Sequence, residues 1–283
     1  MLLVIIFFFS QLIGLLVVSK YVDYSATTEQ DIESGDITWH QLPYSLERPK
    51  VEESSSYLFI IGMIAFGTVL LLLLIKFKIY RLWKLWYFVG TMLCLSVALS
   101  AFIGQSSAFV IALVLSYLKI FRPNVLIHNL TELFIYGGLA AIFVPIINLF
   151  SIFILLILIS AYDFWAVYKS KHMVKIAEFQ TNSKIFAGLL VPYSSQNIIP
   201  KPGKKQTLSK NAILGGGDIG FPLLFAGVIM KNYGLMKAFL IPVAATLGLL
   251  LLLTYAKKDK FYPAMPFLTA ACFIGYVAVL VLS

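Results

Sequence analysis

Long apolar stretches alternate with short polar segments along the whole chain. Most of these stretches approach 20 residues, the length that a helix needs to cross the roughly 30 Å hydrocarbon core of a bilayer. None of them shows the strict alternation that marks the strands of an outer-membrane barrel. The pattern therefore predicts membrane-spanning helices. The nine predicted spans are 2–19, 57–75, 85–104, 106–118, 124–143, 146–167, 211–230, 236–255 and 263–282.

The composition agrees with an all-α, polytopic membrane protein. Hydrophobic residues make up 60% of the chain and charged residues only 12%, whereas about 25% of a soluble domain is charged. The first span has no basic residues before it and its apolar run is long, so we expect it to be retained rather than cleaved as a signal peptide. The net charge of +9 does not indicate nucleic-acid binding, because the basic residues cluster in short loops between the spans.

The distribution of basic residues predicts the orientation of the chain. If the N-terminus is cytoplasmic, 17 of the 22 Lys and Arg residues fall on the cytoplasmic side. Cytoplasmic loops of membrane proteins carry such an excess. We therefore expect the N-terminus inside and, after nine spans, the C-terminus outside.

Two polar segments divide the single membrane domain that we expect. An N-terminal part, 1–167, holds six spans and an acidic outer loop at 20–55. A basic cytoplasmic loop, 168–210, separates it from a C-terminal part, 211–283, with three spans. The basic loop contains the apolar sequence "KIFAGLLVPY", which is too short to span a bilayer and is expected to lie along the interface or pack over a site.

Three acidic residues lie inside apolar spans: Glu132, Asp163 and Asp218. Ionisable groups in such places are costly to desolvate and are candidates for function. Asp163 lies near the end of one span and Asp218 about seven residues into the next. At 1.5 Å per residue, both are roughly 8–11 Å from the cytoplasmic boundary. Adjacent packing of these two spans would bring the carboxylates together.

A pair of buried carboxylates can carry out peptide hydrolysis. Two such groups in a low-dielectric site share one proton, so that one is the base for a water molecule and the other the acid for the carbonyl. Gly215, Gly216 and Gly217, just before Asp218, permit close helix approach, local unwinding and room for a substrate. No cofactor or metal is expected.

Each of these features also has a structural interpretation. Asp163 could be solvated at a helix end, and Asp218 could be the partner of a lysine. His128 and Glu132 form an i,i+4 pair, which is interpreted as a structural polar contact because two ligands are too few for a metal site.

Three motifs, on the sixth, seventh and ninth spans, resemble those of the presenilin and signal peptide peptidase family. "AYDFW" carries the Tyr-Asp pair of the family, "LGGGD" its Gly-x-Gly-Asp motif, and "YPAMP" its Pro-Ala-Leu motif. Their order and the nine-span layout cover nearly the whole chain, and "HMVKIAE" is particularly similar to archaeal presenilin homologues. The matching residues are Tyr162 and Asp163, then Gly215, Gly217 and Asp218, then Pro263, Ala264 and Met265.

The resemblance implies a presenilin-like fold and an intramembrane aspartyl protease in which Asp163 and Asp218 are the catalytic pair. It places the protein in the membrane of an archaeal cell, with transmembrane-helix proteins or peptides as substrates. In the family, the substrate is thought to unwind and add as a strand near the site. Met265 replaces the leucine of the family, a change of similar volume that should be tolerated. The implied substrate-binding residues are Tyr162, Gly215, Gly216, Gly217, Pro263, Ala264 and Met265.

Three alternatives remain. An ion-coupled transporter also uses intramembrane acids and broken helices, but it should show related halves, and no internal repeat is visible. A non-catalytic binding scaffold is the second alternative. A prepilin-type peptidase shares the Gly-x-Gly-Asp motif but is not expected to carry the Pro-Ala motif. The expected partners are the substrate and the lipid bilayer, with no nucleic acid and no evident obligate subunit.

Overall fold

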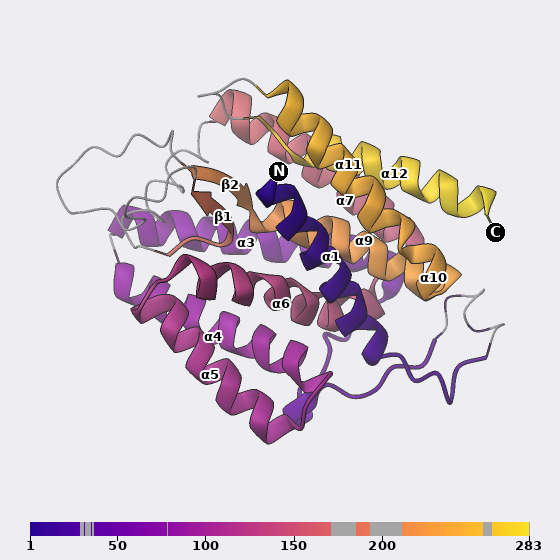
Figure 1. The fold of residues 1–283 in the computed structure, drawn as a ribbon, viewed down its shortest axis with the longest axis horizontal. Helices are drawn as coiled ribbons and strands as arrows, with labels where there is room; N and C mark the ends of the chain where they lie inside the picture. Colours follow the sequence, from indigo (N-terminus) through magenta and orange to yellow (C-terminus); the bar gives the residue numbers. More distant parts are fainter. Residues whose placement is uncertain are drawn as a thin grey trace.

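The structure, a computed structural model, is a bundle of long apolar helices (Figure 1). It describes residues 1–28, 31, 35, 37–77, 79–170, 185–192, 211–256 and 262–282. Six helices in this part of the chain are long and apolar enough to cross a membrane, and two further apolar helices are shorter. The protein is thus a multi-pass membrane protein. The main helices of the described residues are α1 (Leu2–Lys20), α3 (Ser56–Phe77), α4 (Tyr80–Ser100), α5 (Gln105–Phe121), α6 (Val125–Phe143), α7 (Leu149–Trp165), α9 (Gly216–Tyr233), α11 (Leu240–Tyr255) and α12 (Met265–Val281).

Short elements connect or extend these helices. α7 continues into a π-helical turn, and a single helical turn, α10, precedes α11. Two strands, β1 and β2, come between α7 and α9. The bounds of the short elements are η1 (Pro43–Ser45), η2 (Glu53–Ser55), η3 (Val144–Ile146), η4 (Ala166–Ser170), β1 (Gly188–Pro192), β2 (Asn211–Gly215) and α10 (Leu235–Ala238).

Helix α9 occupies the centre of the bundle (Figure 1) and contacts α1, α6, α7, α11 and α12. Helices α4, α5 and α6 pack together on one side, while α7, α11 and α12 cover the other side. Helix α1 lies between α6 and α9. Most of α9, which carries Asp218 in its first turn, is buried. The neighbouring helices therefore enclose it.

Side-chain caps and small residues fix several of these helices. The side chains of Asn124 and Asn148 cap α6 and α7 by accepting hydrogen bonds from backbone N–H groups in the first turn. Gly138 brings α6 against α4 so closely that a Cβ there would lie 1.9 Å from the carbonyl oxygen of Cys94. Such glycines allow membrane helices to approach backbone to backbone.

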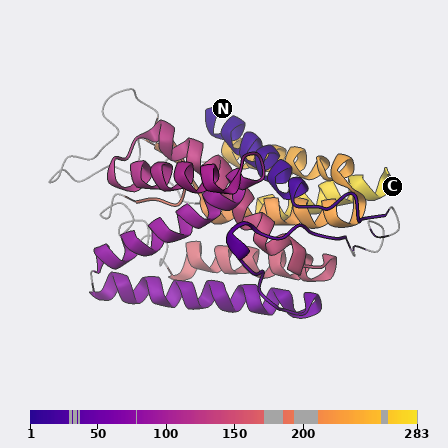
Figure 2. The ribbon, with the colours of Figure 1, turned by 90° about the horizontal axis from the view of Figure 1, so that it is seen from below.

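Helix α3 is the most loosely packed of the six long apolar helices. In the most apolar 18-residue stretch of each helix, 11% is buried for α3, compared with 33–56% for the other five. Figure 2 shows it along one edge of the bundle, beside α7. At its start, Glu53 accepts hydrogen bonds from the buried Lys231 at 2.7 and 2.8 Å, and Ser151 donates one to the Glu53 carbonyl. These contacts anchor one end of α3.

The two strands form an antiparallel sheet, with Gly188 opposite Gly215 and Leu190 opposite Ile213. The sheet lies at one end of the bundle, and the described residues of the 21–55 segment lie at the other end (Figure 1). β1 packs on α1, α6 and α9, and Leu189 is fully buried. The apolar sequence that was too short to span therefore becomes a buried strand, and Lys184 and Tyr193 at its ends lie outside the described residues.

The mostly helical prediction is confirmed, but one span is partly wrong. Residues 211–215 of the predicted span 211–230 are the strand β2, and α9 begins only at Gly216. Glycine disfavours helix by about 1 kcal/mol, and β1 offers the preceding residues a ladder of hydrogen bonds. Asp218 consequently lies in the first turn of its helix rather than seven residues inside it.

Two lysines that we counted as loop residues are buried. Lys119, assigned to the cytoplasmic side, lies on α5 and pairs with Glu132. Lys231, assigned to the outer side, lies on α9 and pairs with Glu53. Much of the basic segment, 171–184 and 193–210, is outside the described residues.

Candidate active site

Asp163 lies in the last turn of α7 and faces the start of α12. Its side chain is buried, with a relative exposure of 6%. The backbone N–H of Met265 donates a hydrogen bond of 3.1 Å to Asp163 Oδ2. The N-terminus of a helix carries partial positive charge and unpaired N–H groups, so it is a favourable neighbour for a carboxylate.

The Pro-Ala-Met motif builds this contact. Pro263, Ala264 and Met265 are all buried, and Ala264 is the N-terminal cap of α12. Because a helix leaves its first N–H groups without helical partners, the Met265 N–H is available to Asp163. The structure therefore places the third motif directly against the first.

Asp218 is half-buried in the first turn of α9. The Gly215 backbone adjoins its carboxyl group, because a Cβ on Gly215 would lie 3.2 Å from Asp218 Oδ2. Pro222 has no N–H to donate to the Asp218 carbonyl, so this turn lacks one helical bond. Gln11 of α1 donates a hydrogen bond of 2.8 Å to the Ile219 carbonyl and holds the turn from another side.

The two aspartates lie in neighbouring helices of the bundle, although 55 residues separate them in the sequence. Asp163 lies close enough to Asp218 for their charges to interact, and α7 packs against α9. Among the described residues, neither aspartate forms an ion pair with a basic residue. A pairing of Asp218 with a lysine, the structural interpretation raised above, is thus not found in this part of the chain.

The three glycines have different surroundings. Gly215 ends β2 and caps α9. A Cβ on Gly216 would lie 2.6 Å from the hydroxyl oxygen of Tyr136, so that position requires a glycine unless Tyr136 moves. Gly217 is exposed. The backbone next to Asp218 is therefore uncovered on one side and tightly packed on the other.

Tyr162 faces a different space from its neighbour Asp163. It lines an apolar groove of about 290 Å³ between α3 and α7, together with Ile64, Ala65, Leu158 and Trp165. Tyr162 is 39% exposed, and its ring lies 6.3 Å from that of Trp165. The groove thus reaches the segment of α7 that carries the buried aspartate.

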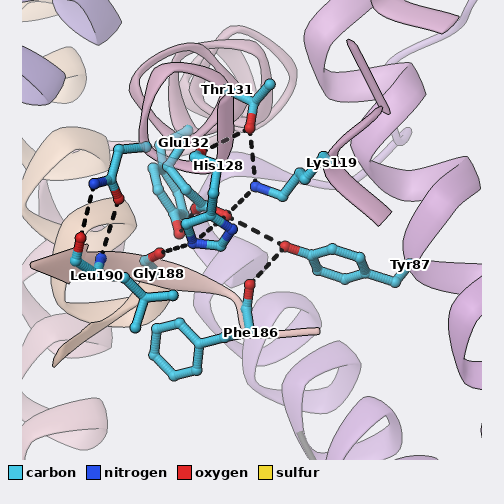
Figure 3. A network of polar contacts seen from close by, with 10 residues as sticks. Tyr87, Lys119, His128, Thr131, Glu132, Phe186, Gly188 and Leu190 are labelled. Atoms are coloured by element: carbon cyan, nitrogen blue, oxygen red, sulfur yellow. Dashed lines mark hydrogen bonds and ion pairs between the residues drawn. The ribbon is translucent and has the colours of Figure 1, made fainter. Parts of the chain in front are cut away.

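A buried polar cluster around Glu132, which we call the Glu132 cluster, joins side chains of α4, α5 and α6 (Figure 3). Lys119 pairs with Glu132, Tyr136 donates a hydrogen bond to the other carboxylate oxygen, and Tyr87 donates one of 3.2 Å. His128 Nε2 lies 4.0 Å from Glu132. The sequence indicated only the His128–Glu132 contact, because the other partners carry no local signal.

The same region of α6 holds strand β1. His128 forms a 2.7 Å hydrogen bond with the Gly188 carbonyl. The Asn129 amide donates to the Leu190 carbonyl at 2.7 Å and accepts from the Leu190 N–H at 3.1 Å. Side chains of α6 therefore occupy the edge of β1 that faces away from β2.

Comparisons with solved structures show which fold this chain has. Two solved structures, described as a presenilin family intramembrane aspartate protease in the P2 and C222 space groups, share the fold. The first is 18% identical with a TM-score of 0.62, and the second is 16% identical with a TM-score of 0.61. Each comparison covers 99% of this chain and 97% of the other.

Sequence comparisons give the family. No curated protein matches the chain. The family model described as "Signal-peptide peptidase, presenilin aspartyl protease" matches residues 6–283. This match includes both aspartates and all three motifs. The chain therefore belongs to the presenilin and signal-peptide peptidase family, and it is an aspartic protease of the membrane.

Proposed function

We propose that Asp163 and Asp218 hydrolyse peptide bonds within the bilayer. One carboxylate takes a proton from water, which attacks the peptide carbonyl, while the other carboxyl group protonates the carbonyl oxygen. The C–N bond of the tetrahedral intermediate then breaks: the leaving nitrogen takes the proton held by the first carboxyl group, and the second carboxylate regains a proton from a hydroxyl of the intermediate as the product acid forms. The two aspartates titrate as a pair, so neither role is fixed to one residue. The observation that carries this proposal is the convergence of the two carboxylates from α7 and α9 at one end of the bundle.

The substrates are transmembrane helices of other proteins, entering through the groove between α3 and α7. This groove is apolar and opens at the loosely packed α3, and Tyr162 in its lining precedes Asp163. An apolar helix therefore meets a matching surface next to the catalytic group. Residues Gly215, Gly216, Gly217, Pro263, Ala264 and Met265 form the remainder of the binding site.

The open edge of β2 provides a place for an unwound substrate strand. Leu190 directs both its N–H and its C=O at Asn129, away from β2. Opposed residues of an antiparallel pair either bond each other or both face outward. Ile213, opposite Leu190, therefore directs its backbone groups to the outer edge of β2, where a third strand can add.

The membrane arrangement follows from the charge distribution. Nine spans with a cytoplasmic N-terminus and an outer C-terminus place the aspartates near the cytoplasmic face of the cell membrane, and the motifs favour an archaeal cell. A cysteine introduced at Ser25 in the outer loop should react with a membrane-impermeant reagent in intact cells. Reaction only after permeabilisation would reverse this orientation.

The competing functions have less support. An ion-coupled transporter needs a pathway and related halves, whereas a family model for aspartyl proteases matches this chain over nearly its full length. If the protein moved solutes in liposomes and cleaved no peptide, transport would replace proteolysis. A scaffold role would leave the purified protein without either activity.

Separate substitutions Asp163→Asn and Asp218→Asn test the proposed function. Each change removes one of the two groups that share the proton, so cleavage of a detergent-solubilised transmembrane peptide should fall by at least about 10³-fold. Asp23→Asn, in the exposed outer loop, is the matched control and should retain activity. Cleavage that survives either active-site change would refute the two-aspartate mechanism.

A further inference from the structure

We propose that Glu132 is a positioning residue for Asp218, acting through Tyr136 and through strand β1. This inference rests on the proposed function, in which Asp218 is one of the two catalytic groups. Glu132 itself is separated from the aspartates by Tyr136, so it has no direct part in the chemistry. Its contribution is to fix the two segments that adjoin Asp218.

The Glu132 carboxylate is held rigidly by its own partners. It is 1% exposed and Lys119 is 4% exposed. Oε1 receives the Lys119 ammonium and the Tyr87 hydroxyl, and Oε2 receives the Tyr136 hydroxyl. Lys119 also donates a 3.1 Å hydrogen bond to Thr131. Because both oxygens are bonded and water is excluded, this carboxylate is a fixed acceptor.

Tyr136 forms the first link from the Glu132 cluster to Asp218. Its hydroxyl, fixed by Glu132, occupies the space where Gly216 lacks a side chain. It is near enough to Asp218 for an electrostatic interaction between them. A Cβ on Gly220, one turn further along α9, would lie 3.6 Å from the same ring. The phenol therefore packs along the first turn of α9 and sets its position.

Strand β1 forms the second link. The Tyr87 hydroxyl shares its single proton between Glu132 and the Phe186 carbonyl just before β1, which lies 3.1 Å away, and His128 donates a hydrogen bond to the Gly188 carbonyl (Figure 3). β1 pairs with β2 as far as Gly215, and Gly215 adjoins the Asp218 carboxyl group, since a Cβ there would lie 3.2 Å from Asp218 Oδ2. Residues that hold Glu132 thus also hold the strand that leads to the catalytic residue.

Positioning has a kinetic signature that a purely structural role lacks. A displacement of about 1 Å at a catalytic group can cost roughly 10²-fold in rate. Loss of the link through Tyr136 should lower kcat with little change in KM, because Tyr136 lies outside the groove and the strand edge that bind the substrate. A purely structural role would change the thermal stability of the protein and leave kcat of the folded fraction unaltered.

The variant Tyr136→Phe tests the first link. It removes only the hydroxyl, and we expect kcat on a transmembrane peptide to fall about 10-fold while KM changes less than about twofold. Tyr233→Phe is the matched control, since it also removes a hydroxyl from a hydrogen-bonded pair, 15 residues along α9 from Asp218 and so roughly 22 Å away. Unchanged kcat in Tyr136→Phe would overturn the inference.

Two double variants test Glu132 without leaving a buried lysine unpaired. Lys119→Met with Glu132→Gln retains an acceptor for Tyr136, whereas Lys119→Met with Glu132→Leu retains none. We expect kcat within about threefold of wild type for the glutamine variant and about 10-fold below it for the leucine variant. Equal kcat in the two would overturn the inference. An inactive wild type, or an active Asp218→Asn variant, would instead overturn the proposed function.

Discussion

Asp163 and Asp218 reach the site in different backbone settings. Asp163 is at the end of α7 and receives the N–H of Met265, whereas Asp218 is in the first turn of its own helix. Both carboxylates are therefore near a helix N-terminus, which favours negative charge. Their mutual repulsion and burial oppose the charging of both groups. A single negative charge shared by the pair is the expected resting state.

This charge state leads to a prediction about pH. The rate of cleavage should have a bell-shaped dependence on pH, because the pair needs one proton. At low pH both carboxyls are protonated and no base remains, and at high pH both are ionised and no acid remains. Initial rates with a transmembrane peptide in one detergent should show both limbs. A rate that is flat between about pH 4 and 9 would contradict the shared proton.

Some residues of the site can be predicted from the sequence, whereas others cannot. Asp163 and Asp218 stand out because an acid in an apolar span is costly, and their similar depth suggested a pair. Lys119, Tyr87 and Tyr136 give no such signal. A lysine near the end of a span is normal at a membrane boundary, and tyrosine is common there. Only the packing of α4, α5 and α6 shows that these three residues meet at Glu132.

The helices themselves could be predicted because hydrophobic length determines them. The strands could not. β1 lies within a polar segment, and β2 begins a mostly apolar stretch of span length, so neither shows an alternating pattern of its own. Their pairing joins residues 188–192 with residues 211–215 across a long connection. Because of this pairing, residues 211–215 form a strand, although their apolar sequence predicts a helix.

The close contact of α4 with α6 at Gly138 leads to a second prediction, about the stability of the protein. Gly138→Ala should lower the free energy of unfolding by about 1–3 kcal/mol, because the added Cβ overlaps the Cys94 backbone and α4 must move away from α6. Unfolding in a denaturing detergent measures the change. Gly90→Ala, on α4, is the control because nothing lies within 4 Å of its Cβ position. Equal stability of the two variants would show that α4 and α6 are not in close contact.

Across the whole molecule, packing is tightest around α9 and weakest at α3. The core therefore fixes the aspartates, while the edge of the bundle is open along the groove between α3 and α7. The contact of Lys231 with Glu53 secures α3 at the far end from the strands. This division separates a tightly packed centre, which holds the proposed catalytic pair, from a surface that can admit a helix.

The groove leads to a prediction about substrate binding. Ala65→Trp should raise KM for a transmembrane peptide several-fold with a smaller effect on kcat, because the indole fills space that we assign to the substrate. Met63→Trp is the control, since Met63 is 53% exposed and does not line the groove. Steady-state kinetics of both variants in the same detergent give the comparison. If Ala65→Trp has the KM of wild type, substrates reach the aspartates by another route.

The ion pair of Lys119 and Glu132 also has a consequence for biogenesis. An ionised side chain that enters lipid alone near the middle of a span costs about 2.5–3.5 kcal/mol on insertion scales. Glu132 lies about two turns inside α6, and only residues 122–124 join α6 to α5. If the two helices leave the translocon as one hairpin, the lysine neutralises the acid before lipid surrounds either residue. Joint release of α5 and α6 is therefore the less costly order of assembly.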